Sequence, residues 1–434
     1  MALTVHQEDK LGELLIVLET SKRVLLKGSA GVGKTYLVNE LINRLSFNIP
    51  SYKKIYVSAP TNKAVGVLSG KVSLESSNAQ LITTHKAMKI GRKINNRNGE
   101  ITFVPMFGEK NPPLKNVALL IIDECSMIGE EMLGWIEEHA LKQRTTIIFI
   151  GDEKQVLPVK ESVRIVFTKN YPTVELTEII RQEEGNPIIT LSRNLATIWH
   201  HITRLVEGDT RKGFVYSFDE AKVVEELAKV NGTDELKYLA WTNKEVDNIN
   251  KKVREKIYCF PRKIEEGESL IFDEPYGDYY VSEEIKVHKL DVADVIFHVI
   301  MEEIPVTVVQ QVSLKCYIIN GEQTDVWGDG VLQWTGVFVI HEDSEKHLRN
   351  LSKTLMFMCG KKKLKYTTRI EFLEKFANTK YNHALTVHKS QGSSYQQTIV
   401  DVGNINLNSD QQDKNGILYT AITRASNLLI LYNV

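Results

Sequence analysis

The sequence predicts an α/β protein built on parallel β-sheets, and three observations carry this prediction. Short apolar runs that end in polar turns alternate with helix-like segments over the first part of the chain. A glycine-rich turn joins one of these runs to the helix that follows it. Strand and helix patterns of the same kind return towards the end of the chain. Because alternating strands and helices form parallel sheets covered by helices, we expect ligands at the carboxyl ends of the strands.

The first α/β region is expected to extend to about residue 180. The run VLLKG, residues 24–28, predicts a buried strand, and residues 35–45 have the spacing of an amphipathic helix. A second helix-like segment occupies residues 130–141. Apolar runs rich in β-branched residues predict further strands at residues 55–60, 117–124 and 145–152.

Residues 91–113 interrupt this alternation and predict a small inserted β-hairpin. Asn98-Gly99 is a strong turn signal, and it lies between a polar arm and an arm of alternating apolar residues. We therefore expect a small β-hairpin inserted in the first α/β region.

A second α/β region is predicted from about Leu176. Residues 238–242, YLAWT, resemble a buried strand, and a helix-like segment follows them. From about 260 to 365 the pattern changes to many short β-type runs, which include SLIFDE, IKVHKL, DVIFHVI and VLQWTGVFVIHE. We expect these runs to form an inserted, mostly β module. The strand–turn–helix pattern returns at residue 383 and continues to the last residue.

Length and composition limit the possible classes of protein. The chain of 434 residues is long enough for two or more domains with their own cores. A formal net charge of −1 does not indicate a polyanion partner, so a nucleic-acid site must be built from local basic residues. We see no signal-peptide layout and no apolar run of membrane-spanning length, and expect no membrane association. The four cysteines form no C-x-x-C pair, which disfavours zinc and disulfides and fits the cytoplasm.

Residues 28–35, GSAGVGKT, match the phosphate-loop pattern G-x-x-x-x-G-K-[ST] at every position. Glycines let the backbone turn tightly with its amide groups directed at phosphate oxygens, and the following helix adds its positive end. Lys34 is expected to contact the β- and γ-phosphates, and Thr35 to place a hydroxyl on Mg²⁺. A glycine-rich turn without function is the competing interpretation, and the flanking strand and helix disfavour it. No guanine-reading Asn-Lys-x-Asp sequence occurs, which disfavours GTP.

Two further strand ends supply candidate catalytic residues. Asp123 follows a buried run in IIDECSM, where a carboxylate can hold Mg²⁺ through water. Glu124 beside it can orient or deprotonate the attacking water. Gln155, in IGDEKQVLPV, is a candidate sensor of the γ-phosphate, although a capped turn explains it equally well. An isolated Asp-Glu pair is usually a solvated turn, but the phosphate loop upstream favours the catalytic interpretation.

In their order along the chain, these blocks resemble the motifs of superfamily 1B, or RecD-like, DNA helicases. The blocks that carry the resemblance are LTVHQ (3–7), GSAGVGKT (28–35), APTNKAV (59–65), TTHKAM (83–88), IIDECSM (121–127), GDEKQVLPV (151–159), LTEIIRQ (176–182), HALTVHKSQGSSY (383–395) and YTAITRA (419–425). An ordered set of this length is highly specific, and it extends over most of the chain.

The resemblance implies two RecA-like P-loop NTPase domains, with a hairpin insert and a mostly β, SH3-like inserted module. The first RecA-like domain (1A) would comprise residues 1–85 and 116–175, and the hairpin (1B), residues 86–115, would be a pin that splits duplex. The second RecA-like domain (2A) would comprise residues 176–254 and 381–434. Residues 255–380 would form the β-rich insert (2B).

The resemblance also implies ATP and Mg²⁺ as cofactors and assigns roles to individual residues. The implied nucleotide-binding residues are Gln7, Gly28, Ala30, Gly31, Val32, Gly33, Lys34, Thr35 and Tyr36, with Thr35 and Asp123 on the metal and Gln7 reading adenine. The implied catalytic residues are Lys34, Asp123, Glu124, Gln155, Arg181 and Arg424. Both arginines would reach the γ-phosphate as the cleft between the domains closes, although an arginine alone more often makes a surface ion pair.

Contacts with DNA are implied for Thr61, Asn62, His85, Phe103, His388 and Ser390. Thr61, His85, His388 and Ser390 are expected at strand exits suited to phosphate or sugar contact, although a histidine alone is more often an ordinary packed or solvent-facing residue. An aromatic hairpin tip could stack on the last base pair, with Phe103 or Phe107 as candidates. For both rings, anchoring the hairpin to its own domain is the stronger interpretation.

The implied activity is an ATP-dependent DNA helicase that moves 5′→3′ on single-stranded DNA and unwinds duplex. One alternative is an ATPase that translocates or displaces proteins without unwinding, and another is a non-enzymatic single-strand binder. An RNA substrate also stays open. The expected partners are single-stranded DNA and single-strand/duplex junctions, and the expected oligomeric state is a monomer. A replication, recombination or repair role, a host-cytoplasm location and a single-strand binding protein or replisome partner depend on the resemblance to phage helicases alone.

Overall fold

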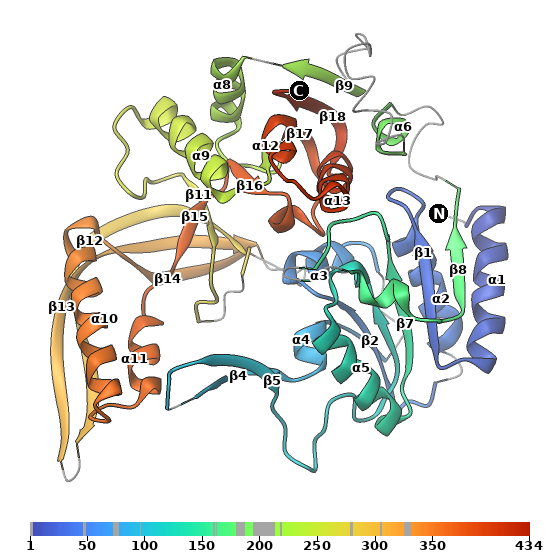
Figure 1. Cartoon of the computed structure of the whole chain (residues 1–434), viewed down its shortest axis with the longest axis horizontal. Coiled ribbons are helices and arrows are strands. Elements are labelled where there is room, and N and C mark those ends of the chain that lie inside the picture. The colour runs from blue at the N-terminus through green and yellow to red at the C-terminus, as the bar shows by residue number, and fades with distance from the viewer. Residues whose placement is uncertain are drawn as a thin grey trace. The chain divides into compact units, whose positions relative to one another are not determined.

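The computed structural model describes residues 3–46, 49–72, 78–95, 97–158, 161, 163–178, 187–193, 213–217, 219–277, 281–303, 306–324 and 331–434 (Figure 1). The chain divides into two compact units. The first unit consists of residues 1–89, 107–253 and 383–434, and the second consists of residues 90–106 and 254–382. In the part of the chain that the structure describes, no helix has both the length and the hydrophobicity needed to span a bilayer.

A six-stranded parallel sheet forms the first half of the first unit, with strand order β3-β2-β6-β7-β1-β8. The strands are β1 (Arg23–Gly28), β2 (Lys54–Ala59), β3 (Ala79–Thr83), β6 (Val117–Ile122), β7 (Thr146–Gly151) and β8 (Thr173–Leu176). The helical segments are α1 (Val5–Thr20), α2 (Lys34–Ser46), α3 (Asn62–Ser69), α4 (Thr84–Ala87), η1 (Cys125–Met127), α5 (Glu130–Gln143) and η2 (Ile165–Thr168). Apolar side chains from these strands are buried against α1, α2 and α3 in one core. Burial on both sheet faces explains why the strands are continuous apolar runs in the sequence.

A five-stranded parallel sheet forms the second half of the first unit, with strand order β16-β10-β17-β18-β9. The strands are β9 (Gly213–Ser217), β10 (Leu236–Ala240), β16 (Ala384–Thr386), β17 (Tyr395–Asp401) and β18 (Ala425–Tyr432). The helical segments are α6 (Pro187–Arg193), α8 (Glu220–Val230), α9 (Asn243–Tyr258), η3 (His388–Ser390), α12 (Val402–Asn406) and α13 (Gln411–Ile422). Two parallel sheets confirm the predicted α/β class.

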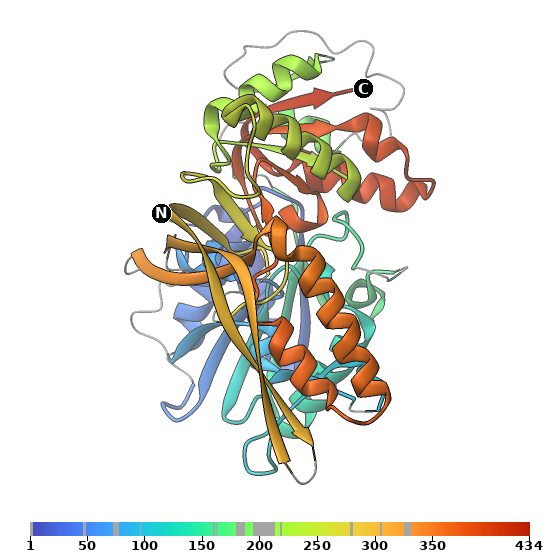
Figure 2. The same ribbon diagram turned by 90° about the vertical axis from the view of Figure 1, so that its left-hand side faces the viewer.

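The second unit is antiparallel. The inserted hairpin consists of β4 (Ile90–Ile94) and β5 (Ile101–Pro105). A five-stranded sheet has the order β14-β13-β12-β11-β15 and consists of β11 (Ser269–Phe272), β12 (Glu284–Glu303), β13 (Val306–Thr324), β14 (Val331–Ile340) and β15 (Thr379–Tyr381). Two helices, α10 (Glu342–Gly360) and α11 (Tyr366–Leu373), lie beside the long β12–β13 hairpin (Figure 2). Leu314, Leu355 and Phe372 are among the side chains that join these helices to the hairpin.

The predicted hairpin is confirmed, and Gly99 supplies the positive φ of +74° that its turn requires. The mostly β insert is confirmed as well, but two details of it were wrong. IKVHKL and DVIFHVI are parts of the single strand β12 rather than separate strands, and its pairing with β13 shifts register at a bulge between Val287 and Lys289. Helix α10 was not predicted. The SH3-like form of the module and the proposed domain boundaries stay predictions.

Candidate functional site

The phosphate-loop sequence forms a tight turn between β1 and α2. Gly31 and Gly33 adopt φ values of +86° and +77°, which L side chains rarely adopt. A Cβ atom at Gly28 would lie 2.8 Å from Cγ2 of Val32, so glycine is required there for close packing. The ammonium of Lys34 donates hydrogen bonds to the carbonyl oxygens of Gly28 (2.7 Å) and Ser29 (3.0 Å). The lysine charge is therefore held within the curve of the loop.

Three other residues assigned to the nucleotide site are Val32, whose side chain supports the loop, and Thr35 and Tyr36, which follow the loop. Val32 is fully buried, so its side chain anchors the loop and only its backbone can face a ligand. Thr35 and Tyr36 occupy the first turn of α2 and are partly exposed. The backbone N–H of Tyr36 donates to the carbonyl oxygen of Gly33 at 3.0 Å, which closes this turn. A glycine-rich turn that leads directly into a helix N-terminus is the arrangement that phosphate sites use.

The acidic pair follows β6 directly. The backbone N–H of Asp123 donates to the carbonyl oxygen of Ser58 on β2 at 2.7 Å, and its Oδ1 accepts from the N–H of Glu124 at 2.9 Å. Burial, with a contribution from the Glu124 charge, raises the pKa of Asp123 to about 6, and Lys34 opposes this rise. Glu124 adopts a left-handed φ of +52°, which is unusual for this residue type. Strained backbone of this kind clusters at functional sites.

Gln155 connects the acidic block to the turn after β7. Its side chain is 3% exposed, and its Oε1 accepts a hydrogen bond from the hydroxyl of Ser126 at 3.1 Å. Ser126, three residues beyond Asp123, is buried. Sequence reasoning missed Ser126, since a serine after an acidic pair carries no signal of its own. The hydrogen bond fixes the distance between the turn with the acidic pair and the turn with Gln155.

Tyr419 joins the helix α13 of the second sheet to the phosphate loop of the first. Its hydroxyl donates to Oδ2 of Asp152 and accepts from the backbone N–H of Ala30 at 3.1 Å. Burial and the Asp152 charge raise the pKa of Tyr419. Next to it, the hydroxyl of Thr420 accepts from the N–H of Val156 at 3.0 Å. None of these residues was a sequence-based candidate except Ala30, although Tyr419 belongs to the same block as Arg424.

The structure describes only one of the two candidate arginines, Arg424. Arg424 is 6% exposed and donates to the carbonyl oxygens of Ser393 (2.9 Å) and Thr420 (3.2 Å), which fixes it beside Tyr419. Arg181 lies outside the described residues. A third arginine, Arg164, was not a candidate, and its Nε donates to the carbonyl oxygen of Gln155 at 2.7 Å.

Gln7 lies in the first turn of α1, where it forms a capping box with Thr4. Its Oε1 accepts from the N–H of Thr4 at 3.2 Å, and Thr4 Oγ1 accepts from the N–H of Gln7 at the same distance. Its Nε2 is buried and has no hydrogen-bond partner among the residues that the structure describes. A buried amide donor without a partner is costly, so this atom is suited to an acceptor on a ligand such as adenine. A buried amide donor of this kind and a phosphate loop in the same half of the first unit fit a nucleotide.

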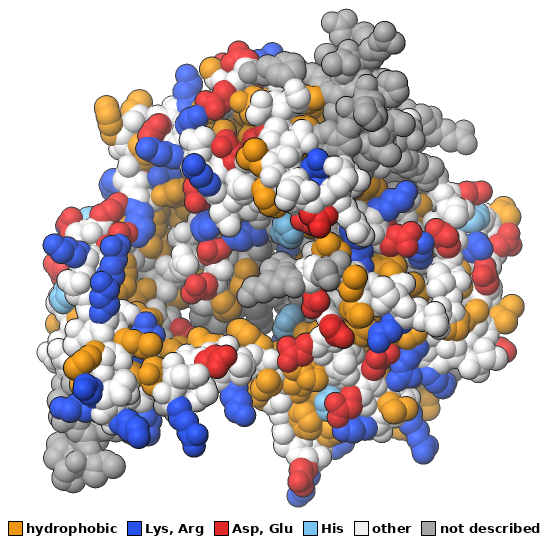
Figure 3. All heavy atoms as spheres, in the orientation of Figure 1, with side chains coloured by type: hydrophobic (Ala, Val, Ile, Leu, Met, Phe, Trp, Pro, Cys, Tyr) orange, Lys and Arg blue, Asp and Glu red, His pale blue; other side chains and the backbone are white. Residues whose placement is uncertain are grey.

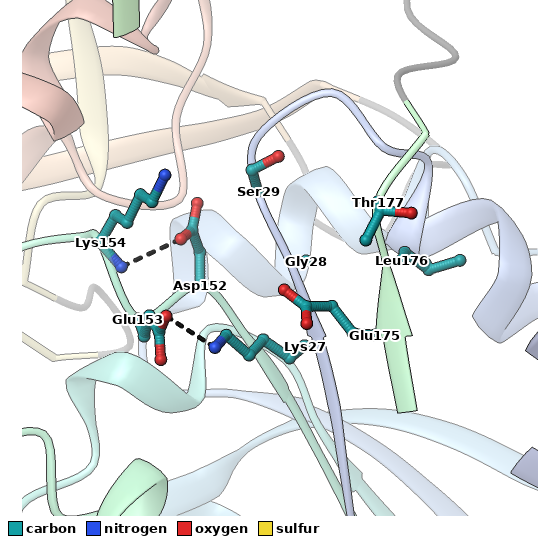
Figure 4. A pocket seen from close by; sticks show the side chains of 9 residues that line it. All are labelled: Lys27, Gly28, Ser29, Asp152, Glu153, Lys154, Glu175, Leu176 and Thr177. Carbon is teal, nitrogen blue, oxygen red and sulfur yellow. Dashed lines mark hydrogen bonds and ion pairs between the residues drawn. The ribbon is translucent and has the colours of Figure 1, made fainter. Parts of the chain in front are cut away.

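A cavity of about 330 Å³ adjoins the start of the phosphate loop (Figure 4). Its walls come from the end of β1, the turn after β7 and the end of β8, and it is lined by Lys27, Gly28, Ser29, Asp152, Glu153, Lys154, Glu175, Leu176 and Thr177. An ion pair between Lys27 and Glu153 (2.6 Å) crosses one side of it. The N–H of Thr177, which lines the cavity, donates to Nε2 of His6 on α1 at 3.3 Å. Helix α1, which also carries Gln7, therefore adjoins this side of the cavity.

Two of the blocks assigned to DNA lie together in the first unit. A Cβ atom at Gly392 would lie 2.7 Å from Cβ of Ala64, so the turn after η3 contacts the start of α3 directly. The Lys63 ammonium lies 5.3 Å from the centre of the Tyr395 ring in the same region. The structure therefore brings the block around α3 (residues 59–65) and the block around η3 (residues 383–395) to one place.

The individual candidates for DNA contact are placed differently within these blocks. Thr61 uses its hydroxyl as the N-cap of α3, where it accepts from the N–H of Ala64 at 3.2 Å, and Asn62 is the first residue of that helix. His85 is exposed on α4, and His388 is partly buried on η3, where burial lowers its pKa. Ser390 is fully buried, and its hydroxyl donates to the carbonyl oxygen of Val387 at 2.8 Å. Its side chain is therefore engaged inside the protein.

The aromatic candidates of the inserted hairpin are not at its tip. Phe103 is 57% exposed and lies opposite Arg92 within the β4–β5 ladder. Phe107 belongs to the first unit, where its ring packs edge-on against His139 of α5 at 5.1 Å between ring centres. The anchoring interpretation is thus supported for Phe107. The residues described at the turn, Asn95 and Arg97 to Glu100, are polar or glycine, so an aromatic tip is not found there.

The fold and the site define a P-loop nucleotide-binding protein with two parallel, RecA-like sheets. A protein-family model described as an AAA domain matches residues 3–219, and one described as a UvrD-like helicase C-terminal domain matches residues 381–432. The chain therefore belongs to the AAA-domain family and is a member of the superfamily 1B helicases.

Curated relatives match nearly the whole chain. The ATP-dependent DNA helicase dda of Enterobacteria phage T4 is 26% identical over 97% of both chains. The ATP-dependent DNA helicase Pif1 of Campylobacter jejuni is 26% identical over 96% of this chain and 89% of its own. A solved Pif1 helicase from Bacteroides, in complex with ADP-AlF3 and single-stranded DNA, covers 99% of this chain and 92% of its own, with a TM-score of 0.50 and 17% identity. This last likeness concerns the fold alone.

Proposed function

We propose that this protein is an ATP-dependent DNA helicase that moves 5′→3′ along single-stranded DNA and separates duplex. The observation that carries the proposal is the pair of hydrogen bonds that joins Tyr419 to Asp152 and Ala30. Through them the second sheet contacts the phosphate loop of the first sheet. A change at the nucleotide can therefore alter how the two halves of the first unit hold a strand, which is what a translocating motor requires.

The residues of the phosphate loop and the acidic pair have the chemistry that nucleotide hydrolysis needs. Lys34 and the loop amides would hold the β- and γ-phosphates, and Thr35 with Asp123 would hold Mg²⁺. The metal would neutralise phosphate charge. With a pKa of about 6, Asp123 is mostly ionised at neutral pH and so is competent to bind a cation. Glu124 would accept the proton of the attacking water, and Gln155 would orient that water.

The arginines would complete the site from the second half of the first unit. Arg424 is fixed by two carbonyl oxygens beside Tyr419, and a modest movement of α13 would carry both residues together. We assign the same role to Arg181 on the basis of its motif. Cations that arrive from a second lobe stabilise the transition state only when the lobes close, which couples hydrolysis to movement.

The strand itself would lie on the surface where the α3 and η3 blocks meet. Thr61, Asn62, His85, His388 and Ser390 belong to these blocks or adjoin them, and Phe103 would contribute from the hairpin. The proposal retains the domain division given above, a monomer as the active form and junction DNA as the substrate. A single-strand binding protein or replisome partner and a location in the host cytoplasm are part of the same proposal.

The test uses two duplexes, one with a 5′ single-stranded tail and one with a 3′ tail, in the presence of ATP and Mg²⁺. We expect unwinding of only the 5′-tailed duplex, and loss of this activity in Lys34→Ala. Unwinding of only the 3′-tailed duplex would contradict the direction of movement. ATP hydrolysis on single strands without unwinding of either duplex would favour the alternative, a translocase that displaces proteins.

Deletion of residues 94–104 addresses the same alternative from the structural side. This deletion removes the described hairpin turn while leaving the first unit intact. We expect it to abolish unwinding and to preserve hydrolysis on single strands. Unchanged unwinding would exclude the hairpin as the element that separates the strands.

A further inference from the structure

The second unit contains a concentration of positive charge that the proposed activity does not use. Between residues 346 and 365 the sequence contains no Asp or Glu, although the chain as a whole has a net charge of −1. Six exposed cations of this segment form what we call the basic ridge: Lys346, Arg349, Lys353, Lys361, Lys362 and Lys363. Figure 3 shows Lys and Arg side chains gathered along the part of the molecule that Figure 1 draws as α10 and the β4–β5 hairpin.

The ridge is one face of an amphipathic helix. Leu348, Leu351, Leu355 and Met358 follow helical spacing and pack into the core of the second unit. The cations Lys346, Arg349 and Lys353 are spaced three and four residues apart on the exposed side, and Lys361 to Lys363 follow at the end of the helix. From Lys346 to Lys361 the ridge extends roughly 22 Å at the rise of an α-helix.

The acidic residues near the ridge do not neutralise it. Acids of α10 occur only in its first turn, where Asp343 pairs with Lys315 (2.7 Å) and Glu345 pairs with Lys263 (2.6 Å). After α11, Glu374 pairs with Arg92 of the inserted hairpin. None of the six ridge cations forms an ion pair with a residue that the structure describes. A set of like charges without counter-charges costs stability, so an anionic ligand bound at this surface would relieve that cost.

The turn of the inserted hairpin packs beside the ridge, within the same unit. Gly99 lies so close to the ring of Tyr366 that a Cβ atom there would overlap it, and Ile94 packs against the cluster that contains Leu364. Leu364 and Tyr366 closely follow Lys361 to Lys363 in the chain. The hairpin adds two more exposed cations, Lys93 and Arg97. The hairpin turn therefore adjoins the segment of the second unit that carries Lys361 to Lys363.

We propose that the basic ridge binds the phosphate backbone of double-stranded DNA that has not yet been separated at the hairpin. This inference rests on the proposed function, because it takes the hairpin as the point where the duplex ends. A straight row of charges about 22 Å long can follow the backbone of a stiff duplex over roughly two thirds of its helical turn of about 34 Å. A flexible single strand has no fixed straight path that such a row would match. Single-strand sites add aromatic platforms. The exposed aromatic residue on α10 itself, Phe357, instead has Lys361 over its ring at 5.6 Å.

The experiment measures binding of a fluorescent blunt duplex and of a single strand to the full-length protein without ATP, over a range of salt concentrations. The variant combines Lys361→Gln, Lys362→Gln and Lys363→Gln. We expect its duplex affinity to fall about tenfold, and the slope of log affinity against log salt to decrease by about 2 to 3. Single-strand affinity and single-strand-stimulated ATP hydrolysis should remain within a factor of about two of the unmodified protein, because the ridge is proposed to contact only duplex phosphates.

Two further variants control for folding and for net charge. Arginine at all three positions retains the charge and should restore duplex binding. The matched control replaces three exposed lysines of the first unit, Lys142, Lys169 and Lys222, with glutamine and should leave duplex binding unchanged. Three outcomes overturn the proposal: unchanged duplex affinity in the ridge variant, an equal loss of single-strand affinity, or ridge-dependent binding of phosphatidylserine vesicles without binding of duplex. Absence of DNA-stimulated hydrolysis in the unmodified protein would overturn the proposed function alone, since duplex binding is measured without ATP.

Discussion

The hydroxyl of Tyr419 donates a hydrogen bond to Oδ2 of Asp152, which lies in the turn after β7 of the six-stranded sheet. The same hydroxyl accepts from the N–H of Ala30, so one side chain contacts the phosphate loop and the turn after β7 together. Asp152 is 3% exposed, and its Oδ1 accepts from the N–H of Lys154 at 3.0 Å. Tyr419 therefore links α13 directly to the phosphate loop.

Replacing Tyr419 with phenylalanine should reduce ATP hydrolysis while leaving the fold intact. The change removes a hydrogen bond to a buried carboxylate, and bonds of this kind typically contribute about 1.5–3 kcal/mol. If the bond is specific to the catalytically competent arrangement, its loss lowers the rate roughly ten- to hundredfold. We expect this loss in kcat, measured by steady-state hydrolysis on single-stranded DNA, with a much smaller change in the KM for ATP.

Tyr238→Phe is the matched control for this variant. Tyr238 is also buried, and its hydroxyl donates to Oδ2 of Asp401 at 2.6 Å, inside the second sheet and away from the phosphate loop. Both variants should lose thermal stability, but only Tyr419→Phe should lose hydrolysis. Equal kinetics in the two variants would show that the Tyr419 hydrogen bonds serve stability alone.

Glu124→Gln should separate nucleotide binding from hydrolysis. Removal of a general base typically reduces the rate about 10²- to 10⁴-fold, and the amide cannot accept the proton of water. Binding of a fluorescent ATP analogue should persist in this variant and be lost in Lys34→Ala, because Lys34 holds the phosphates. Glu131→Gln, an exposed acid at the start of α5, is the control and should hydrolyse ATP normally. Normal turnover by Glu124→Gln would remove Glu124 from the mechanism.

Gly99→Val should disturb the hairpin without affecting the nucleotide site. Gly99 has a φ of +74°, and its Cα lies against the ring of Tyr366, so valine introduces both backbone strain of about 1–3 kcal/mol and a steric clash. We expect duplex unwinding to decrease and single-strand-stimulated hydrolysis to be preserved. Gly108→Ala provides the control, because a Cβ atom at this position would meet no neighbouring side chain or backbone within 4 Å. Unchanged unwinding in Gly99→Val would show that contact with α11 does not support the hairpin.

The stability of the first unit should decrease in mild acid partly because of His139. This side chain is 5% exposed, its Nδ1 has no hydrogen-bond partner among the described residues, and burial lowers its pKa. The unfolded state, with a histidine pKa of about 6.5, then binds more protons than the folded state as the pH falls below this value. Stability is therefore lost towards acid pH, by at most about 1.4 kcal/mol per pH unit for this one group.

Thermal unfolding at pH 7.5 and pH 5.5 measures this effect. His139→Gln cannot titrate, so its unfolding temperature should fall less between the two pH values than that of the unmodified protein. His298→Gln, at an exposed position on β12, is the control variant. The same acid-induced loss in the unmodified protein and in His139→Gln would exclude this histidine as a cause.

The sequence predicted those parts of the structure whose signal is local. The strands β1, β6 and β7 are buried on both faces, which produces continuous apolar runs, and the phosphate loop has its own glycine pattern. Helix α10 was missed although its apolar residues follow helical spacing, because the surrounding β-type runs dominated the interpretation. The single strand β12 was divided in two because charged residues such as Asp291 and Asp294 interrupt its apolar alternation.

In the candidate site, too, residues with a local sequence signal were predictable and residues defined by distant contacts were not. Lys34, Asp123 and Glu124 were predictable from short motifs. The structure places Asp123 and Glu124 directly after β6, and Lys34 at the start of α2, after the loop that follows β1. The contacts of Tyr419 and Arg164 were not predictable, because each is defined by a hydrogen bond to a residue in another part of the chain. The burial of Ser390 likewise depends on the packing of η3 and has no local signal.

The strand order of the second sheet has a consequence for how the chain is made. Strand β10 pairs only with β16 and β17, and β9 pairs only with β18, among the strands that the structure describes. All three partners are encoded after residue 383, beyond the whole antiparallel insert. During synthesis, β9 and β10 therefore stay unpaired until residues 384–432 have been made. By then all six strands of the first sheet have already been synthesised. A nascent chain stalled before β16 would expose the apolar β10 and become a target for chaperones or proteases.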